Sequence, residues 1–252
     1  MHPIAYTVIR WLGQACFLIT TLAGSHLLID PPHPEIGYHI AAHSIPADVV
    51  FVSHNHPDHN FVDAAEGHPF IVQPSGNIKQ SVAENTQGNV TYSGNFIDSG
   101  TSKSKEYSFQ RIFAYHDNVH GAKRGFDTIT VLHTGGLSIC HLGDLGQLAL
   151  TPNQIHEIGH VDILMIPVGG FFTIDGTNAA KIVAQLHPHV ILPMHYQTPA
   201  LSADIKSKLA PPDAFLAAMQ GHAKIVHIGA RDLNLSPSTL PKTPTIYLLR
   251  YE

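Results

Sequence analysis

Apolar residues occur in short groups along the first part of the chain, either alternating with polar residues or running together, and glycine and proline separate the groups. These groups cover residues 6–11, 16–20, 26–29, 48–53 and 70–72. Alternation with a period of two, over about four to eight residues, is typical of β-strands. The pattern therefore predicts that the chain opens as a series of short strands.

The middle of the chain contains a polar stretch, residues 88–106, for which we expect turns and strand edges. Apolar groups of the strand type then return at residues 108–114, 128–132 and 137–141. Gly135 and Gly136 separate the last two groups, and adjacent glycines favour the two-residue turn that joins antiparallel strands. We expect a hairpin at this position.

From Thr151 onward the sequence carries helix signals. Thr151 can cap a helix that has Pro152 at its first position. Gln154 can complete a capping box, and Gly159 can end the helix. Further helices are predicted at residues 177–186, 202–209 and 212–220, and strands at 161–166, 190–192, 224–228 and 245–249. This alternation is typical of a layered α/β protein, and no linker interrupts it, so we expect one domain over residues 1–252.

Composition narrows the classes of partner. Hydrophobic residues make up 44% of the chain, charged residues only 13%, and the net charge is −5. A long nucleic acid is therefore an unfavourable partner, because its phosphates require clustered basic residues. The first residues lack a secretion signal, and no apolar run reaches the roughly 18 residues that span a bilayer. We expect a cytoplasmic protein that acts on a small molecule; the sequence is also compatible with a homo-oligomer.

The two cysteines, Cys16 and Cys140, lie inside apolar segments. We expect reduced thiols in the core, as in most cytosolic proteins, with a single disulfide between them as the alternative.

The strongest chemical signal is His54-Asn55-His56-Pro57-Asp58-His59, which directly follows a predicted strand. Histidine and carboxylate side chains at this spacing project from one short loop, where they could hold two cations side by side. Imidazole nitrogen and carboxylate oxygen suit zinc, iron or manganese. Because the chain contains 20 histidines, the alternative is a polar surface loop that is rich in histidine by chance.

Beyond this motif, the sequence resembles the metallo-β-lactamase superfamily, and within it the branch that contains L-ascorbate 6-phosphate lactonase and many uncharacterised metal-dependent hydrolases. The resemblance rests on segments in the family's order: 11–13 (WLG), 28–31 (LIDP), 54–59 (HNHPDH), 115–117 (YHD), 141–144 (HLGD), 167–170 (PVGG) and 193–196 (PMHY). It implies a four-layer αββα sandwich with a dinuclear metal centre.

The resemblance also implies a role for individual residues. His54, His56 and His116 would bind the first metal ion, and Asp58, His59 and His195 the second. Asp144 would bridge both ions. Zinc is the first choice of metal, with manganese or iron as alternatives. A hydroxide held by the two ions would attack an ester, lactone or phosphodiester of a small, anionic substrate, and Asp58 and Asp144 would be catalytic residues through the metal.

Geometry argues against three other histidines as ligands of this centre. His187 and His189 precede a strand whose far end carries His195, and six strand residues span about 20 Å. The same arithmetic places His133 about 23 Å from Asp144. None of the three can reach ions that lie only about 3.5–4 Å apart.

Four further residues have two interpretations each. His120 could line the pocket or donate a proton, or it could be a solvated loop residue. Asp30 follows a strand where family members hold an acidic residue that supports a metal-binding histidine, or it forms a turn. Lys123 and Arg124 could receive an anionic group of the substrate, although an exposed turn is the simpler interpretation.

Three rival functions share the fold. A metal-dependent oxidoreductase of the superfamily typically has glutamate at the position of His56 and a fused flavin domain. A tRNA-processing ribonuclease normally uses a basic arm, and the sequence has no basic insertion. A non-catalytic relative would be expected to have lost ligands, whereas this chain retains all seven. The sequence therefore favours a metal-dependent hydrolase.

Overall fold

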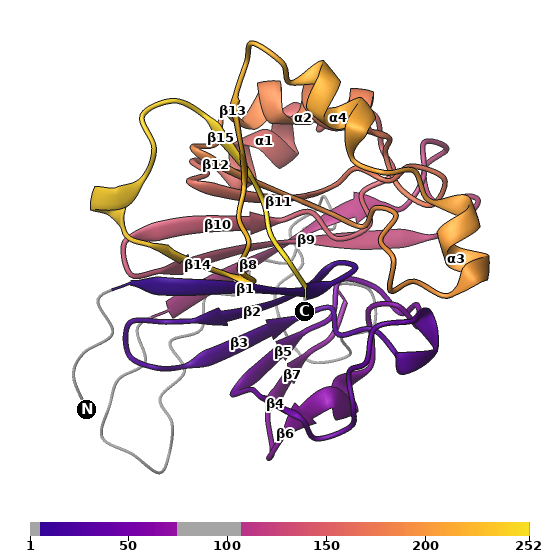
Figure 1. The fold of residues 1–252 in the computed structure, drawn as a ribbon, viewed down its shortest axis with the longest axis vertical. Helices are drawn as coiled ribbons and strands as arrows, with labels where there is room; N and C mark the ends of the chain where they lie inside the picture. The colour runs from indigo at the N-terminus through magenta and orange to yellow at the C-terminus, as the bar shows by residue number, and fades with distance from the viewer. Residues whose placement is uncertain (1–5, 75–106, 252) are drawn as a thin grey trace.

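Two β-sheets stacked face to face form the centre of the computed structural model, which describes residues 6–74 and 107–251 (Figure 1). The first sheet has six strands in the order β14 (Asp232–Leu235), β1 (Thr7–Gly13), β2 (Cys16–Thr20), β3 (His26–Ile29), β5 (Val49–Phe51) and β7 (Phe70–Val72). Its strands are antiparallel from β14 to β3 and parallel from β3 to β7.

The second sheet has seven strands in the order β13 (Lys224–His227), β15 (Thr245–Leu248), β12 (Val190–Met194), β11 (Ile163–Pro167), β10 (Leu137–His141), β9 (Phe126–Thr134) and β8 (Tyr107–Tyr115). Strands β8, β9 and β10 are antiparallel, and the remaining neighbours are parallel. Both sheets are therefore mixed.

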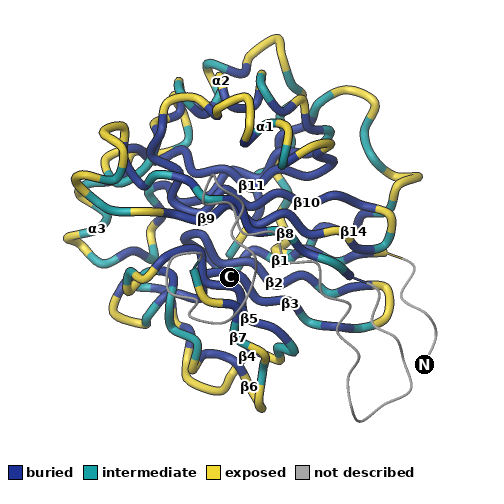
Figure 2. The backbone as a smooth tube through the Cα atoms, turned by 180° about the vertical axis from the view of Figure 1, so that it is seen from behind, coloured by how far each residue is buried: buried dark blue, intermediate teal, exposed yellow. Residues whose placement is uncertain are grey.

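Alternation along the strands of the first sheet divides their side chains between two apolar cores. Phe17 and Ile19 of β2 face the core shared with the second sheet, whereas Leu18 faces the outer core. Strand β5 repeats the pattern, with Phe51 inward and Val50 outward. The central strands of both sheets are accordingly mostly buried in Figure 2, whereas β7, β13 and β14 contain exposed residues. A period of two places a residue and its neighbour on opposite faces, so both faces of this sheet must be covered.

Helices and short turns provide that cover. Helices α1 (Pro152–Ile158), α2 (Gly176–Leu186) and α4 (Asp213–Ala218) lie over the outer face of the second sheet. The outer core of the first sheet is closed by 3-10 helices η1 (Pro34–Ile36) and η2 (Val62–Ala64), by the paired strands β4 (Ile45–Pro46) and β6 (Ala65–Glu66), and by α3 (Ala203–Lys208). The predicted αββα arrangement is confirmed.

The predicted elements agree with the structure to within two residues at each end, for the part of the chain that the structure describes. Thr151 and Gln154 form the expected capping box, and Gly159 ends α1. Gly135 and Gly136, both with positive φ, form the two-residue turn between β9 and β10. The predicted turns at residues 88–106 lie outside the described residues.

Strands β14, β4 and β6 were missing from the prediction. Strand β14 alternates polar and apolar residues over only four positions, Asp232 to Leu235, and it gains its stability by pairing with β1 at the other end of the chain. Strands β4 and β6 have two residues each, too few to show any periodicity.

Cys16 and Cys140 are both buried and free, so the alternative of a disulfide between them is wrong for this structure. They belong to different apolar cores, on opposite faces of the first sheet. Among the described helices, none has the length and apolar character that a bilayer crossing requires.

Candidate metal centre

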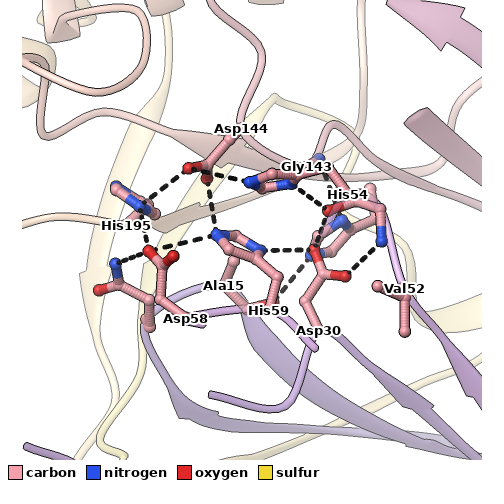
Figure 3. Close-up of polar contacts among 12 residues, drawn as sticks. Ala15, Asp30, Val52, His54, Asp58, His59, Gly143, Asp144 and His195 are labelled. Carbon is pink, nitrogen blue, oxygen red and sulfur yellow. Dashed lines mark hydrogen bonds and ion pairs between the residues drawn. The ribbon is translucent and has the colours of Figure 1, made fainter. Parts of the chain in front are cut away.

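The predicted ligands come from four loops, each of which follows a strand. Strand β5 leads to the loop of residues 54–59, β8 to His116, β10 to Asp144 and β12 to His195. These strand ends meet at one edge of the two sheets, so Asp58 and His195, 137 positions apart in the sequence, become neighbours (Figure 3). Layered α/β proteins gather their binding loops at strand ends in the same way.

The structure brings all seven predicted ligands together in two adjacent groups. In each group the potential ligand atoms lie within 4.8 Å of one another. The first group is His54, His56 and His116; the second is Asp58, His59, Asp144 and His195. The division is the one that the resemblance implied.

Asp144 lies between the two groups. Its Oδ2 is 3.5 Å from Nε2 of His116, in the first group, and 3.2 Å from Nε2 of His195, in the second. Its Oδ1 is 3.2 Å from Nε2 of His59. One buried carboxylate therefore contacts histidines of both groups, as a ligand shared by two ions must.

Asp58 completes the second group from the motif loop. Its Oδ2 lies 3.4 Å from Nε2 of His59 and 3.3 Å from Nε2 of His195. Gln14 donates a hydrogen bond of 3.0 Å to the same oxygen. The sequence analysis missed Gln14, whose neighbours Trp11 and Gly13 it had used only as family markers.

Asp30 holds His59 in place. Its Oδ2 accepts a hydrogen bond of 2.9 Å from Nδ1 of His59, and it also accepts hydrogen bonds from the hydroxyl and the backbone N–H of Ser53. With a proton on Nδ1, the imidazole keeps a lone pair on Nε2, which faces Asp58 and Asp144. Of the two interpretations of Asp30, the structure favours support of a histidine.

His141 and Gly143 shape the turn that carries Asp144. Nε2 of the buried His141 donates to the carbonyl of Ala15 at 2.8 Å, and its Nδ1 accepts from the backbone N–H of Gly143 at 3.1 Å. Gly143 has a φ of 54°, and a Cβ there would meet Oδ1 of Asp127 at 2.3 Å. The turn therefore needs glycine for its backbone conformation and for the close approach of a carboxylate.

Asp127 is a second residue that the sequence did not reveal. It is 1% exposed, and its Oδ1 lies 3.5 Å from Nδ1 of His54. The hydroxyl of Ser53 is 3.0 Å from the same nitrogen. A single aspartate inside an apolar strand carries no motif, so only the fold shows that it faces the centre.

The protonation states of the residues at the centre follow from their burial and from the charged groups close to them. Burial disfavours the charged carboxylate of Asp144, but the charges of the adjacent His195 and His59 outweigh burial and hold its pKa well below the usual range. Burial likewise opposes protonation of His195, yet Asp144 and Asp58 raise its pKa to about 9. Burial lowers the pKa of His116 to about 4. The carboxylates are thus ionised, as metal ligands must be.

Several buried polar atoms of the centre have no hydrogen-bond partner. They include Nε2 of His54, Nε2 of His59 and Oδ1 of Asp144. Leaving such atoms unpaired costs free energy, about 1–3 kcal/mol each. Divalent metal ions would satisfy nitrogen lone pairs and carboxylate oxygens together, so the residues present fit a metal centre.

The loop after His116 is organised by Asp117. Its two carboxylate oxygens accept four backbone hydrogen bonds of 2.8 Å, from residues 119, 121, 123 and 124. His120 lies exposed in this loop with a φ of 57°, and its ring packs on Tyr115. It belongs to neither ligand group, and its predicted role as a proton donor remains a prediction.

Arg124 reaches aromatic residues beside the second group. Its guanidinium carbon lies 5.8 Å from the ring centres of both Phe171 and Phe172. The ring of Phe172 in turn lies 6.3 Å from that of His195. Arg124 is therefore linked to His195 through Phe172, whereas Lys123 is exposed.

Comparison with known proteins decides the family. The model of the Beta-lactamase superfamily domain matches residues 8–195. A UPF0173 metal-dependent hydrolase of Carboxydothermus hydrogenoformans is 31% identical over 213 residues, which cover 78% of this chain and 88% of that protein. The chain belongs to the UPF0173 metal-dependent hydrolases of the β-lactamase superfamily. Another UPF0173 metal-dependent hydrolase, of Anaeromyxobacter dehalogenans, is 29% identical and covers 87% of this chain and 83% of its own.

A solved structure of a similar hydrolase supports the fold of the described residues. The crystal structure of a proposed Zn-dependent hydrolase of the metallo-β-lactamase superfamily from Thermotoga maritima has a TM-score of 0.66 and 28% identity, and covers 97% of this chain and 98% of its own. The predicted superfamily and enzyme class are confirmed. These relatives support the hydrolase class. None of them places the chain in the branch of L-ascorbate 6-phosphate lactonase.

Proposed function

We propose that this metal-dependent hydrolase cleaves an ester, lactone or phosphodiester bond of a small, anionic substrate at a centre of two divalent metal ions. The position of Asp144 carries the proposal, because its carboxylate contacts His116 of one ligand group and His195 of the other. A shared carboxylate is the feature that distinguishes a dinuclear centre from two independent sites. Zinc is the first choice of metal, because imidazole and carboxylate are common ligands of catalytic zinc.

The residues of the centre divide the work between binding and orientation. His54, His56 and His116 would hold one ion, and Asp58, His59 and His195 the other, with Asp144 shared. When bound, the two ions supply Lewis acidity and a water of lowered pKa, so that no serine or cysteine nucleophile is required. Asp30 and Asp127 orient imidazoles from behind, through contacts with Nδ1 of His59 and Nδ1 of His54.

Charge and shape beside the centre support a small anionic substrate. Arg124 has no carboxylate partner among the described residues, and it lies near the rings of Phe171 and Phe172, of which Phe172 is next to His195. Lys208, which also approaches Phe172, is already paired with Asp204 at 2.7 Å. We therefore propose that the guanidinium of Arg124 receives the anionic group, while the phenylalanine rings contact an apolar part of the substrate.

A substrate panel tests this function. Zinc-reconstituted protein is assayed with lactones, phosphodiesters and thioesters, each in an anionic and a neutral form. For the substrates that are cleaved, Arg124→Ala should raise KM for the anionic form about tenfold and change kcat little, whereas Lys123→Ala, its exposed neighbour, should change neither. Equal effects of the two variants would contradict the role of Arg124.

The same assay distinguishes the rival functions. Cleavage of a small substrate should survive excess tRNA and depend only weakly on salt, since the substrate makes few ionic contacts. Inhibition by low tRNA concentrations, with cleavage of the tRNA at a defined position, would favour a tRNA-processing ribonuclease. Metal-dependent oxygen uptake without hydrolysis would favour an oxidoreductase. We further propose a cytoplasmic location. We also propose that the protein has no nucleic-acid partner, in keeping with the net charge of −5.

A further inference from the structure

A third group of metal-binding side chains lies apart from the candidate metal centre. His160, Asp162 and His189 each offer a ligand atom, and these atoms lie within 4.8 Å of one another. Asp162 directly precedes β11, and His189 directly precedes β12. The two strands are parallel with Ile163 opposite Val190, so the residues before them are neighbours.

The length of β12 separates this group from the centre. His189 lies before the strand and His195 after it, and six residues of extended chain span about 20 Å. The same reasoning that excludes His189 from the dinuclear centre therefore makes this group an independent site, at the opposite ends of the strands.

Backbone contacts orient two of the three side chains. Oδ2 of Asp162 accepts a hydrogen bond of 2.8 Å from the N–H of Ser138, which leaves Oδ1 available. Nδ1 of His189 lies 3.1 Å from the carbonyl oxygen of Pro241. Because a carbonyl only accepts, Nδ1 must carry the proton, and Nε2 keeps its lone pair. Metal-binding histidines in proteins are oriented by the same type of backbone contact.

The third side chain is open to solvent. Nε2 of His160 lies 2.9 Å from Oδ1 of Asp162, and the side chain of His160 is 70% exposed. An ion can therefore enter from solution by displacing one hydrogen bond. Two imidazoles and one carboxylate suit zinc, nickel or copper, whereas calcium and magnesium prefer oxygen ligands.

We propose that His160, Asp162 and His189 bind a divalent transition-metal ion in a surface site separate from the catalytic centre. The ion ties the start of β11 to the start of β12. Through the contact of His189 with Pro241, it also restrains the segment that leads into β15. Its effect is on stability, since the site lies a full strand length from the candidate active centre.

Calorimetric titration of Zn²⁺ into the full chain tests the site. Wild type should bind one ion more per chain than His160→Ala, which removes a side chain that is 70% exposed. His189→Gln should show the same loss. His156→Ala, an exposed histidine of α1 four residues from His160, is the matched control and should bind as many ions as wild type.

Saturating Zn²⁺ should also raise the Tm of wild type and of His156→Ala more than that of His160→Ala, with the hydrolase activity of all three unchanged. The test compares the number of ions bound by wild type with the number bound by each variant. Its outcome therefore does not depend on how many ions the dinuclear centre binds. The proposal is overturned if His160→Ala binds as many ions as wild type, or if His156→Ala loses an ion as well. The three side chains then form only a hydrogen-bonded cluster.

Discussion

The carboxylate of Asp30 accepts a hydrogen bond of 2.9 Å from Nδ1 of His59, and both side chains are fully buried. Asp30 has a φ of 48°, a backbone conformation that non-glycine residues seldom adopt. The contact thus comes from a left-handed backbone turn at Asp30, directly after β3. This contact holds the imidazole of His59 in one orientation.

Asp30→Asn should weaken binding of the second metal ion by about 10–100-fold, because the imidazole loses the charged partner that increases its basicity. Asp63→Asn, at an exposed carboxylate of η2, should leave metal affinity unchanged. Competition with a zinc chelator measures both. A merely structural role for Asp30 would lower the Tm of the variant and leave the metal affinity of the folded protein as it was.

His56→Ala should abolish hydrolysis while the protein stays folded. The apolar core between the sheets does not depend on metal, unlike that of a zinc finger, so loss of one half-buried ligand should not unfold the chain. Activity and thermal unfolding of the variant are compared with those of His68→Ala, at an exposed histidine. Unfolding of His56→Ala alone would make the site structural rather than catalytic.

Gly143→Ala should lower both stability and activity. Any residue other than glycine at this positive φ costs about 1–2 kcal/mol, and the new Cβ would also meet the carboxylate of Asp127. Gly67 also has a positive φ, but there is open space around it. Gly67→Ala is therefore the control that measures the backbone cost alone. We expect Gly143→Ala to be the more destabilising change in a denaturant titration, and the only one that lowers kcat. Equal effects would show that contact with Asp127 does not matter.

Asp232→Asn should reduce stability in a pH-dependent way. The hydrogen bond from Arg10, which links β1 to β14, lowers the pKa of Asp232 below its usual value. A lowered folded-state pKa contributes stability above the unfolded value of about 3.9, and the contribution is lost as the pH falls through the folded-state pKa. Both side chains are 35% exposed, so we expect a difference below about 1 kcal/mol at pH 7.

Denaturant titrations measure this effect. They compare Asp232→Asn with wild type at pH 7 and at the lowest pH at which both proteins are folded. The difference should shrink toward acid pH, and Glu66→Gln, at an exposed carboxylate, should show little difference at either pH. A difference that grows on acidification would contradict the pairing.

Most of the fold could be predicted because its signals are local, and the seven ligand candidates could be named from the motif loop and from the family resemblance. The loop of residues 54–59 follows an obvious strand, and Asp144 and His195 lie in short motifs at strand ends. Gln14 and Asp127 could not be found in this way. Each acts across elements that are distant in the sequence, Gln14 on Asp58 and Asp127 on His54, and neither belongs to a local pattern.

Elements of low periodicity were missed for a related reason. Strand β14 has only four residues, and its partner strand β1 lies more than 200 positions earlier in the sequence. The position of Arg124 was equally hidden, since its sequence indicates only a turn between glycines. The four backbone hydrogen bonds to Asp117 decide where that turn places the guanidinium.

Metal analysis of purified, zinc-reconstituted His160→Ala is the most direct test of the central claim, because this variant removes the proposed surface site from the count. The account predicts about two ions per chain, and about one after the further change Asp144→Asn, with hydrolysis lost. A single ion per chain in fully active His160→Ala would contradict the dinuclear centre.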